Sequence, residues 1–482
     1  MEEGGGPRVV NAMQESSVKW CSVNLSDIIS RGKRLEASVF DVEAKQARQI
    51  IQACKYPTTF IGGESGLTTS YTGARFKRVW LKKSEYPIFQ PSSITDIKPS
   101  PDGYISHLTK TNIDKLRVKK GQVLLTCSGT IGKVSYVSST LDRKIFSHDL
   151  LRIDCRTPSD AGYIYAYLKS KIGNKILLTN SYGAVITHIE SEHLATVPVP
   201  DAPVEIKGKI SNLIVRSYEL RDESNSLIDE ATALLVEALM LPPIERFNIN
   251  TANAVESFSI KLSDLNHRAD ASYHLPIVDK IIEHLSEHAE DLSMVGDLRI
   301  SKDVILPGRF KRIYVDEGFG TVLFGGKQIH ELDPSGKKYL STARHDKRII
   351  NQLQISENTI LISRSGTIGK VTLVPKHWGN WVASEHIIRI IPASNEIAGY
   401  ISIFLSSDYG YQLITHYTYG SVVDEIDDSH VKEIPIPLLK DKEVQKKIND
   451  LALLANQKRY EAYCLEQEAL KILDEEVIFI AK

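Results

Sequence analysis

A hexapeptide whose residue types suit phosphate binding occurs twice in this chain. Ser-Gly-Thr-Ile-Gly-Lys occupies Ser128–Lys133 and again Ser365–Lys370. Its glycines free the backbone for tight turns, and its Ser, Thr and Lys side chains could contact a phosphate. A Walker A loop needs another glycine upstream and Ser or Thr after the lysine, but Cys127 and Arg364 stand upstream and a valine follows each lysine. The pattern predicts a tight β-turn, with contact to a phosphate backbone as the alternative.

A second repeated segment is strongly basic. Arg-Phe-Lys-Arg occurs at Arg75–Arg78 and at Arg309–Arg312. Three cations around an aromatic ring suit DNA, through phosphate neutralisation or a bidentate arginine on guanine. The alternative is a solvated strand edge, where cations discourage aggregation. We expect DNA contacts from Arg75, Lys77, Arg78, Arg309, Lys311 and Arg312, and phosphate contacts from Lys133 and Lys370.

These two repeats belong to a longer series in the same order. Other matched segments are Leu25-Ser26-Asp27 with Leu262-Ser263-Asp264, Ala161-Gly162-Tyr163-Ile164 with Ala398-Gly399-Tyr400-Ile401, Tyr182-Gly183 with Tyr419-Gly420, and Pro198-Val199-Pro200 with Pro435-Ile436-Pro437. Most pairs are 365 − 128 = 237 residues apart. A period this long predicts tandem duplication of a whole domain. Whatever one half binds, the other half should bind something of the same kind.

Composition sets broad limits. The chain has 482 residues, 42% of them hydrophobic, and a net charge of −1, so any nucleic-acid contact must come from local clusters. Five scattered cysteines without a Cys-x-x-Cys pair give no zinc, redox or disulfide framework, and a cytoplasmic location is expected. No apolar run approaches the ~20 residues of a membrane span. We recognise no catalytic signature: an Asn/Asp-Pro-Pro-Tyr/Phe methyltransferase motif is missing, and no Gly-x-Gly-x-x-Gly follows a strand.

Each half reads as a globule followed by a long helix. Gln122–Val137 predicts strand, turn and returning strand, and Thr359–Val374 repeats that pattern. Short helices are expected at Ala161–Leu177 and Ala398–Ile414, and the Pro-x-Pro segments should end each globule. Heptads then begin at Ile206 and at Val444, with small residues at many d positions. About 35 residues at ~1.5 Å each would make a rod of about 50 Å.

The predicted fold class is α+β, with two tandem-duplicated mixed α/β domains separated by two long antiparallel coiled-coil helices about a pseudo-twofold axis. Packing of each helix on its own globule is the alternative. Lys458 and Glu476 interrupt the apolar seam of the second helix. The expected boundaries are an N-terminal tail at 1–24, the first domain at 25–202, helix 203–241, a linker at 242–261, the second domain at 262–440 and helix 441–482.

The doubled architecture, together with the repeated hexapeptide, Tyr-Gly-Ala/Ser-Val and Val/Ile-Pro segments, resembles the specificity subunit of type I restriction–modification systems. The resemblance implies two target recognition domains, each reading one half of a split DNA site, and a subunit that is not an enzyme. It implies adenine methyltransferase partners, two of them, which use S-adenosylmethionine, and ATP-driven restriction subunits in the full assembly. The chain itself would hold no cofactor. Base-reading residues should lie where the halves differ, at Ser84–His107 and Phe319–Arg344.

Other functions stay open at this point. One is a protein–protein scaffold built on the rods; another is a related defence complex that lacks the restriction motor. A chain with its own nuclease or transferase activity is disfavoured by the missing motifs. Salt-sensitive DNA binding would separate the first of these from a DNA reader, because phosphate contacts weaken steeply with salt.

Overall fold

The computed structural model describes residues 22–30, 33–183, 186–247, 258–265, 268–420 and 422–480. Most of the predicted N-terminal tail and much of the predicted linker lie outside these residues, as do Ala184, Val185 and Ser421 of the Tyr-Gly segments. We call residues 25–241 the first half and residues 262–480 the second half.

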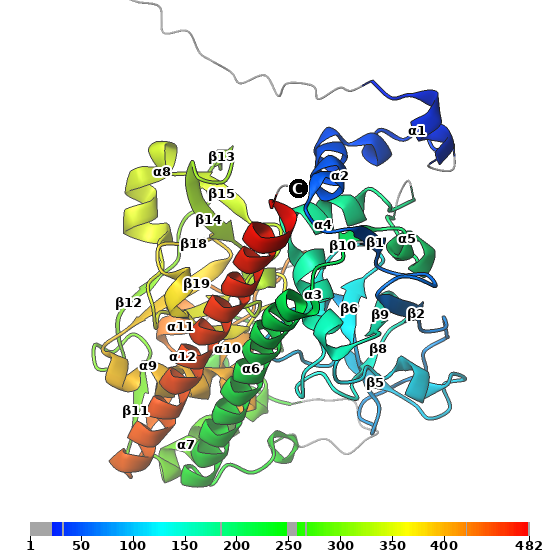
Figure 1. Ribbon diagram of the computed structural model, residues 1–482. Helices are drawn as coiled ribbons and strands as arrows, with labels where there is room; N and C mark the ends of the chain where they lie inside the picture. Colours follow the sequence, from blue (N-terminus) through cyan, green and yellow to red (C-terminus); the bar gives the residue numbers. More distant parts are fainter. Residues whose placement is uncertain are drawn as a thin grey trace, which may run out of the picture.

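The same sheet topologies occur in both halves (Figure 1). An antiparallel base sheet has the order β2-β9-β6-β7 in the first half and β12-β19-β16-β17 in the second. A smaller tip sheet has the order β3-β5-β4-β8 or β13-β15-β14-β18, with one parallel pair in each. A two-stranded sheet, β1-β10 or β11-β20, completes each half. The bounds in the first half are β1 Thr58–Phe60, β2 Thr68–Thr72, β3 Trp80–Leu81, β4 Pro87–Phe89, β5 Gly103–Ile105, β6 Val123–Thr126, β7 Val134–Tyr136, β8 Ile145–Phe146, β9 Leu150–Cys155 and β10 Pro198–Pro200. In the second half they are β11 Asp291–Met294, β12 Ser301–Ile305, β13 Tyr314–Val315, β14 Gly320–Phe324, β15 Lys338–Ser341, β16 Ile360–Ser363, β17 Val371–Leu373, β18 Val382–Ala383, β19 Ile387–Pro392 and β20 Pro435–Leu438.

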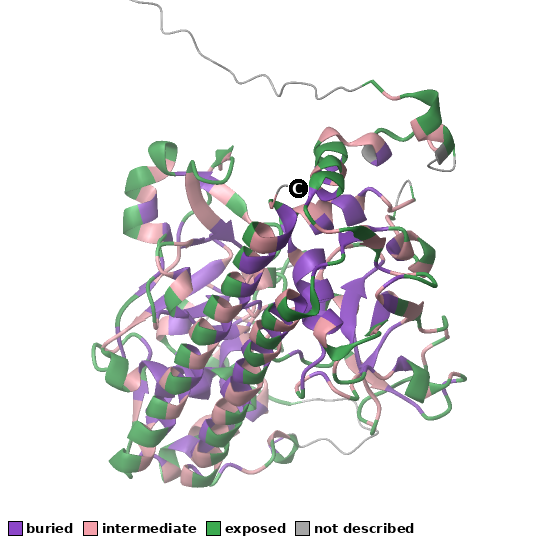
Figure 2. Ribbon diagram, in the orientation of Figure 1, coloured by how far each residue is buried: buried purple, intermediate pink, exposed green. Residues whose placement is uncertain are grey.

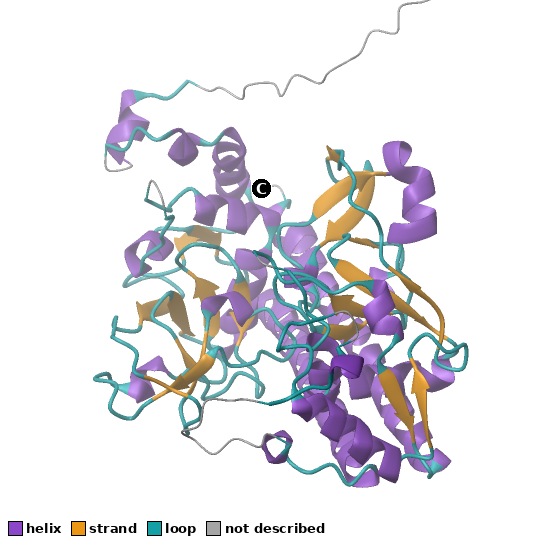
Figure 3. Cartoon of the chain, turned by 180° about the vertical axis from the view of Figure 1, so that it is seen from behind, coloured by secondary structure: helices purple, strands orange, loops and turns teal. Residues whose placement is uncertain are grey.

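Helices pack beside these sheets and enclose an apolar core in each half (Figures 2 and 3). α3 packs on β6, β7 and β9, and α9 packs on β17 and β19. The α-helices are α1 Leu25–Ser30, α2 Val42–Ala53, α3 Pro158–Lys169, α4 Lys171–Leu178, α5 Ser191–Ala195, α6 Val204–Ala238, α7 Pro276–His288, α8 Thr342–Arg348, α9 Asn395–Ser406, α10 Asp408–Thr415, α11 Asp428–Lys432 and α12 Lys442–Leu473. Short 3-10 helices lie at Ala37–Phe40, Pro91–Ser93, Ile113–Leu116, Ile244–Arg246, Leu262–Asp264, Gly326–Gln328 and Lys376–Trp378, and π-helical turns at Ile349–Leu353 and Asp474–Ile478.

Two details of the predicted elements need correction. Each predicted short helix is a pair of helices, because Ser170 and Ser407 break the run and cap the second member by accepting the Gly173 or Gly410 N–H. The Pro-x-Pro segments do not merely end the globules but form strands β10 and β20. Proline fits there because a two-stranded sheet consists of edge strands, which tolerate the missing donor.

α6 and α12 lie side by side and run antiparallel (Figure 1). The seam buries small or apolar side chains at d positions, namely Ile210, Ser217, Ser224, Ala231, Ile448, Ala455, Ala462 and Ala469. The two charges that interrupt the predicted seam pair with the opposite helix: Lys458 Nζ lies 2.5 Å from Glu223, and Glu476 lies 3.0 Å from Lys209 Nζ. The sequence of partners, in which low numbers on α6 meet high numbers on α12, fixes the antiparallel direction.

Each long helix also packs on its own globule, so the contact considered as the alternative occurs together with the mutual one. The repeated Ala-Gly-Tyr-Ile segment makes this crossing close. A Cβ at Gly162 would lie 2.5 Å from Ser211 Cα on α6, and one at Gly399 would lie 2.4 Å from the Asn449 carbonyl on α12. Only glycine fits there. Each long helix therefore has one face on its globule and another on its partner helix.

Within the described ranges, no helix has both the length and the apolar character required to cross a bilayer. Nor does that part of the chain contain a cluster of three or more His, Cys, Asp or Glu placed to hold a metal ion.

Candidate nucleic-acid interface

The first basic loop, Arg75–Arg78, connects the base sheet to the edge strand of the tip sheet. Arg75 and Lys77 are exposed, while the Arg78 guanidinium stacks 5.7 Å from the Trp80 ring centroid. Phe76 anchors the loop against the apolar cluster under the tip sheet. The part of the chain that the structure describes contains no ion pair to any of these three cations. Their charge is therefore available to an anionic ligand.

The second basic loop, Arg309–Arg312, takes the equivalent place between β12 and β13, but its arginines are paired. Arg309 Nη2 lies 3.1 Å from Glu425, although three quarters of its side chain is exposed, and Arg312 Nη2 lies 2.6 Å from Glu385. Glu425 also binds Arg364. Lys311 remains exposed. The second basic loop thus carries less unbalanced positive charge than the first.

The residues facing the basic loops explain this difference. At the positions 237 residues before Glu385 and Glu425, the first half has His148 and His188. Burial lowers the pKa of His148; neighbouring Asp149 acts against this, and Arg75 and Arg78 lower it further. His148 is therefore held neutral beside the first basic loop. An acidic residue occupies both positions in the second half and a histidine both in the first.

The glycine hairpins, Ser128–Lys133 and Ser365–Lys370, turn as predicted between β6 and β7 and between β16 and β17. Gly129, Gly132, Gly366 and Gly369 all have positive φ, between 70° and 89°, a region that favours glycine. Each hairpin begins with a bridge to the end of the Tyr-Gly loop, Ser128 to His188 and Ser365 to Glu425. Tyr182 and Tyr419 pair with the same two positions. Hairpin and Tyr-Gly loop therefore adjoin in both halves, and in the second half the Arg309–Glu425 ion pair joins the basic loop to them.

Both hairpin lysines face the opposite half. Lys133 Nζ lies 2.6 Å from the buried carboxylate of Glu331, and its own side chain is only 15% exposed. Burial raises the pKa of Asp96 to about 6, and Lys370 opposes that rise across the same contact. Asp96 and Glu331 form a backbone bridge between the halves. A phosphate could reach Lys133 only if this ion pair opened, so the structure places the two lysines between the halves while their predicted phosphate contact stays a prediction.

Two other sets of residues were not singled out by the motifs. Arg152 and Arg389 are fully buried and donate to backbone carbonyls of the tip-sheet region, including Phe146 at 3.1 Å and Leu353 at 3.3 Å. They tie each tip sheet to its base sheet, and their 237-residue offset was a signal that could have revealed them. The other set is helix α8 with Arg344, His345, Lys347 and Arg348, which has no counterpart among the first-half helices.

The predicted base-reading segments are only partly at the surface. Ser84–His107 runs through β4 and β5, and Phe319–Arg344 runs through β14 and β15 into α8. Within them, residues 96–97 and 330–331 meet each other: Ile97 N–H donates to the His330 carbonyl at 2.9 Å. These central parts join the halves, and the remaining parts form the tip sheets.

Comparison with known proteins identifies the class. Residues 330–451 match the family model described as type I restriction modification DNA specificity domain. The match confirms the family resemblance suggested by the repeated motifs, and it lies within the second half of the chain. No curated protein sequence matches the chain.

Three solved structures also align with most of the chain. The type I restriction-modification S subunit from M. genitalium is 15% identical, with 88% of this chain and 96% of that chain covered and a TM-score of 0.34. The HsdS subunit from Thermoanaerobacter tengcongensis is 12% identical, with 86% and 98% covered and a TM-score of 0.27. A third structure, described by the assembly and conformational transition of a type I R-M system, is 16% identical, with 86% and 98% covered and a TM-score of 0.27.

Proposed function

We propose that this chain is the DNA-reading subunit of a type I restriction–modification complex, or of a related defence complex, and that each half reads one part of a split site. One observation supports this most strongly: each half repeats a glycine hairpin bridged to a Tyr-Gly loop, together with a basic loop between its base sheet and its tip sheet, and the two halves share the paired helices α6 and α12. A repeated surface on a rigid support suits two separate contacts with one duplex.

The paired helices would set the separation of the two contacts. Helix α6 has 35 residues, which corresponds to about 50 Å at ~1.5 Å per residue, or roughly 15 base pairs at ~3.4 Å each. The same helices would dock the methyltransferase subunits. S-adenosylmethionine would then be held by the methyltransferase and ATP by a restriction subunit where one is present. The chain itself would carry out no reaction.

Selection from a randomised duplex pool tests this proposal. The chain is copurified with its neighbouring methyltransferase, and the bound DNA is sequenced. Two specified blocks separated by a fixed unspecified gap are the expected result. One continuous block, or no enrichment, would contradict it. Incubation of the chain alone with DNA and labelled S-adenosylmethionine should give no methyl transfer.

The repeat provides a matched pair of variants. Arg75→Ala and Arg309→Ala remove equivalent arginines from the two basic loops. Each should weaken binding through one half-site, and the two should affect opposite half-sites when either block of the selected sequence is scrambled. Because Arg309 is paired with Glu425, its effect should be the smaller one. Equal loss at both half-sites for either variant would contradict a separate reader in each half.

A further inference from the structure

The second half carries a basic surface that the described residues of the first half lack. Helix α8 follows the tip-sheet strand β15 and contains Arg344, His345, Lys347 and Arg348 with Asp346 as its single acid. At the equivalent place after β5, the first half has a loop and then the 3-10 helix Ile113–Leu116. Figure 1 shows α8 at the outer end of the second half, beside β13 and β15.

Helix α8 is fastened to the second basic loop. The Arg348 guanidinium lies 4.8 Å from the Phe310 ring centroid and donates to the Gly308 carbonyl at 2.9 Å. The His345 ring meets Phe310 edge-on at 5.3 Å and accepts the Ile313 N–H at 3.2 Å. Helix and loop therefore present one continuous surface, in which the central aromatic of the repeated basic segment serves as the anchor.

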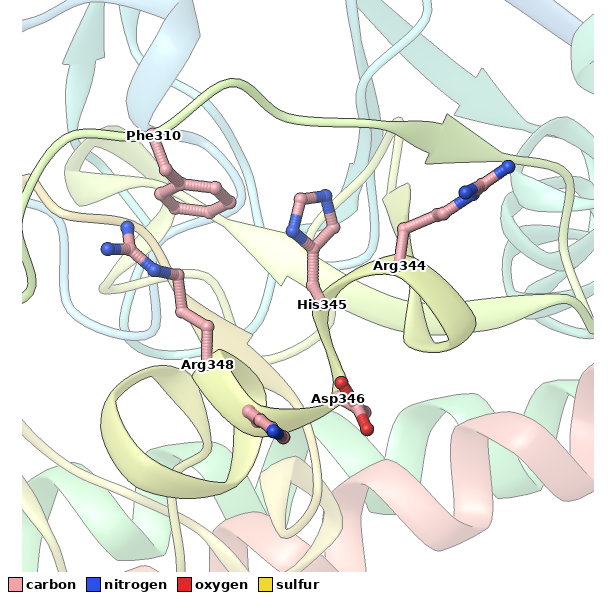
Figure 4. Close-up of a pocket in the computed structure, with 6 residues that line it drawn as sticks. Phe310, Arg344, His345, Asp346 and Arg348 are labelled. Carbon is pink, nitrogen blue, oxygen red and sulfur yellow. The ribbon is translucent and has the colours of Figure 1, made fainter. Parts of the chain in front are cut away.

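Between these side chains lies an open hollow of about 330 Å³, lined by Phe310 and by residues 344–348 (Figure 4). The helix kinks at His345, whose φ is −130° and ψ 17°. Arg344 and Arg348 lie on opposite sides of that kink, and Arg348 reaches toward Phe310. Cations and an aromatic ring thus line the hollow together.

The charges on α8 are unbalanced, in contrast to those of the neighbouring basic loop. Arg309 and Arg312 have carboxylate partners, whereas Arg344 and Lys347 are exposed and have no ion-pair partner in the described part of the chain. In the first half the situation is reversed, because the basic loop itself is unpaired there. Unpaired positive charge therefore lies on the basic loop in the first half and on α8 in the second half.

From this we infer that α8 is a DNA-backbone contact specific to the second half, with Arg344 and Lys347 each neutralising a phosphate of one half-site. The inference rests on the proposed function and deepens it. The two halves would contact the DNA backbone of their half-sites with different elements, the first half with its basic loop and the second half chiefly with α8. The ligand class is the phosphodiester backbone of duplex DNA.

The test is the double variant R344Q/K347Q in the full chain copurified with its methyltransferase. Each lost phosphate contact lowers the slope of log affinity against log salt concentration by ~0.9. We therefore expect the slope to fall by about 1.8 and the affinity near 0.15 M salt to fall by about 10- to 30-fold. The matched control K45Q/K302Q removes two exposed lysines from α2 and β12 and should change neither value.

Ethylation interference on the selected duplex locates the contact. Wild type should show interfering phosphates at both half-sites, and R344Q/K347Q should lose them at one only. An unchanged slope, or loss at both half-sites, would overturn the inference. The salt slope can be measured on any duplex, so a failure of sequence selection would refute the split-site proposal while still deciding the role of α8. Thermal unfolding of both variants checks that the fold is intact.

Discussion

The most informative stability test concerns Glu466, a fully buried carboxylate on α12 that joins three elements. It accepts hydrogen bonds from Tyr165, from Lys169 Nζ at 2.9 Å and from Arg221 Nη2 at 2.8 Å. Tyr165 and Lys169 belong to α3 and Arg221 to α6. Burial raises the pKa of Glu466, but the two cations lower it more, and the net pKa lies below the usual value. The carboxylate is therefore ionised.

Glu466→Gln keeps the size of the side chain and removes its charge. Arg221 is then left buried without an acidic partner, whereas Lys169 retains Asp333 at 3.4 Å. Removing one partner of a buried ion pair costs about 3–5 kcal/mol. Since one of the two cations keeps a carboxylate, we expect the free energy of unfolding to fall by about 3 kcal/mol.

Urea unfolding monitored by circular dichroism measures this loss. The matched control is Glu461→Gln, which changes an exposed glutamate on the same helix and should alter stability by less than about 0.5 kcal/mol. A loss for Glu466→Gln below about 1 kcal/mol, or one equal to that of the control, would refute the reasoning that the buried cations depend on this carboxylate.

Three further outcomes are expected. Lys133→Met should cost about 3 kcal/mol in urea unfolding, because Glu331 is left buried and unpaired; an unchanged stability with a salt slope of DNA binding lowered by ~0.9 would show instead that Lys133 contacts a phosphate. Burial lowers the pKa of His377 to about 4, whereas the pKa of a histidine in the unfolded chain is about 6.5. The unfolding free energy should therefore fall as the pH drops below about 6.5, by about 2 kcal/mol at pH 5. His377→Gln should show a correspondingly smaller drop in unfolding free energy between pH 7 and pH 5. Ala462→Leu should overpack the α6–α12 seam, where Ala462 is fully buried, and lower the unfolding free energy by about 1–3 kcal/mol.

Local pattern sufficed for much of the strand and helix content. The run from Val123 to Val137 alternates around two glycines, and β6, the hairpin and β7 lie there. The heptads of α6 and α12 likewise span long helices. Such features depend on residues close in sequence, which is why spacing alone predicts them.

Local sequence patterns could not predict contacts between residues that are distant in the sequence. Nothing near Lys133 signals that its partner lies 198 residues away at Glu331, so a lysine at the end of a glycine hairpin resembled a phosphate ligand. The neutralisation of Arg309 and Arg312 depends on two glutamates from other loops. Helix α8 is short and its sequence, Thr-Ala-Arg-His-Asp-Lys-Arg, has no apolar periodicity, so tertiary packing on Phe310 rather than local propensity holds it.

The direct contacts between the halves restrict how this architecture could change during evolution. Ile97 links the second half to helix α6. Its N–H donates to the His330 carbonyl, and its own carbonyl accepts from Asn225 on α6, each at 2.9 Å. An insertion of one turn into both long helices would shift the globules by about 5.4 Å and break these bonds. A change of helix length would therefore need matching changes in the bridging loops, so helix length and bridging loops must change together for the distance between the halves to change.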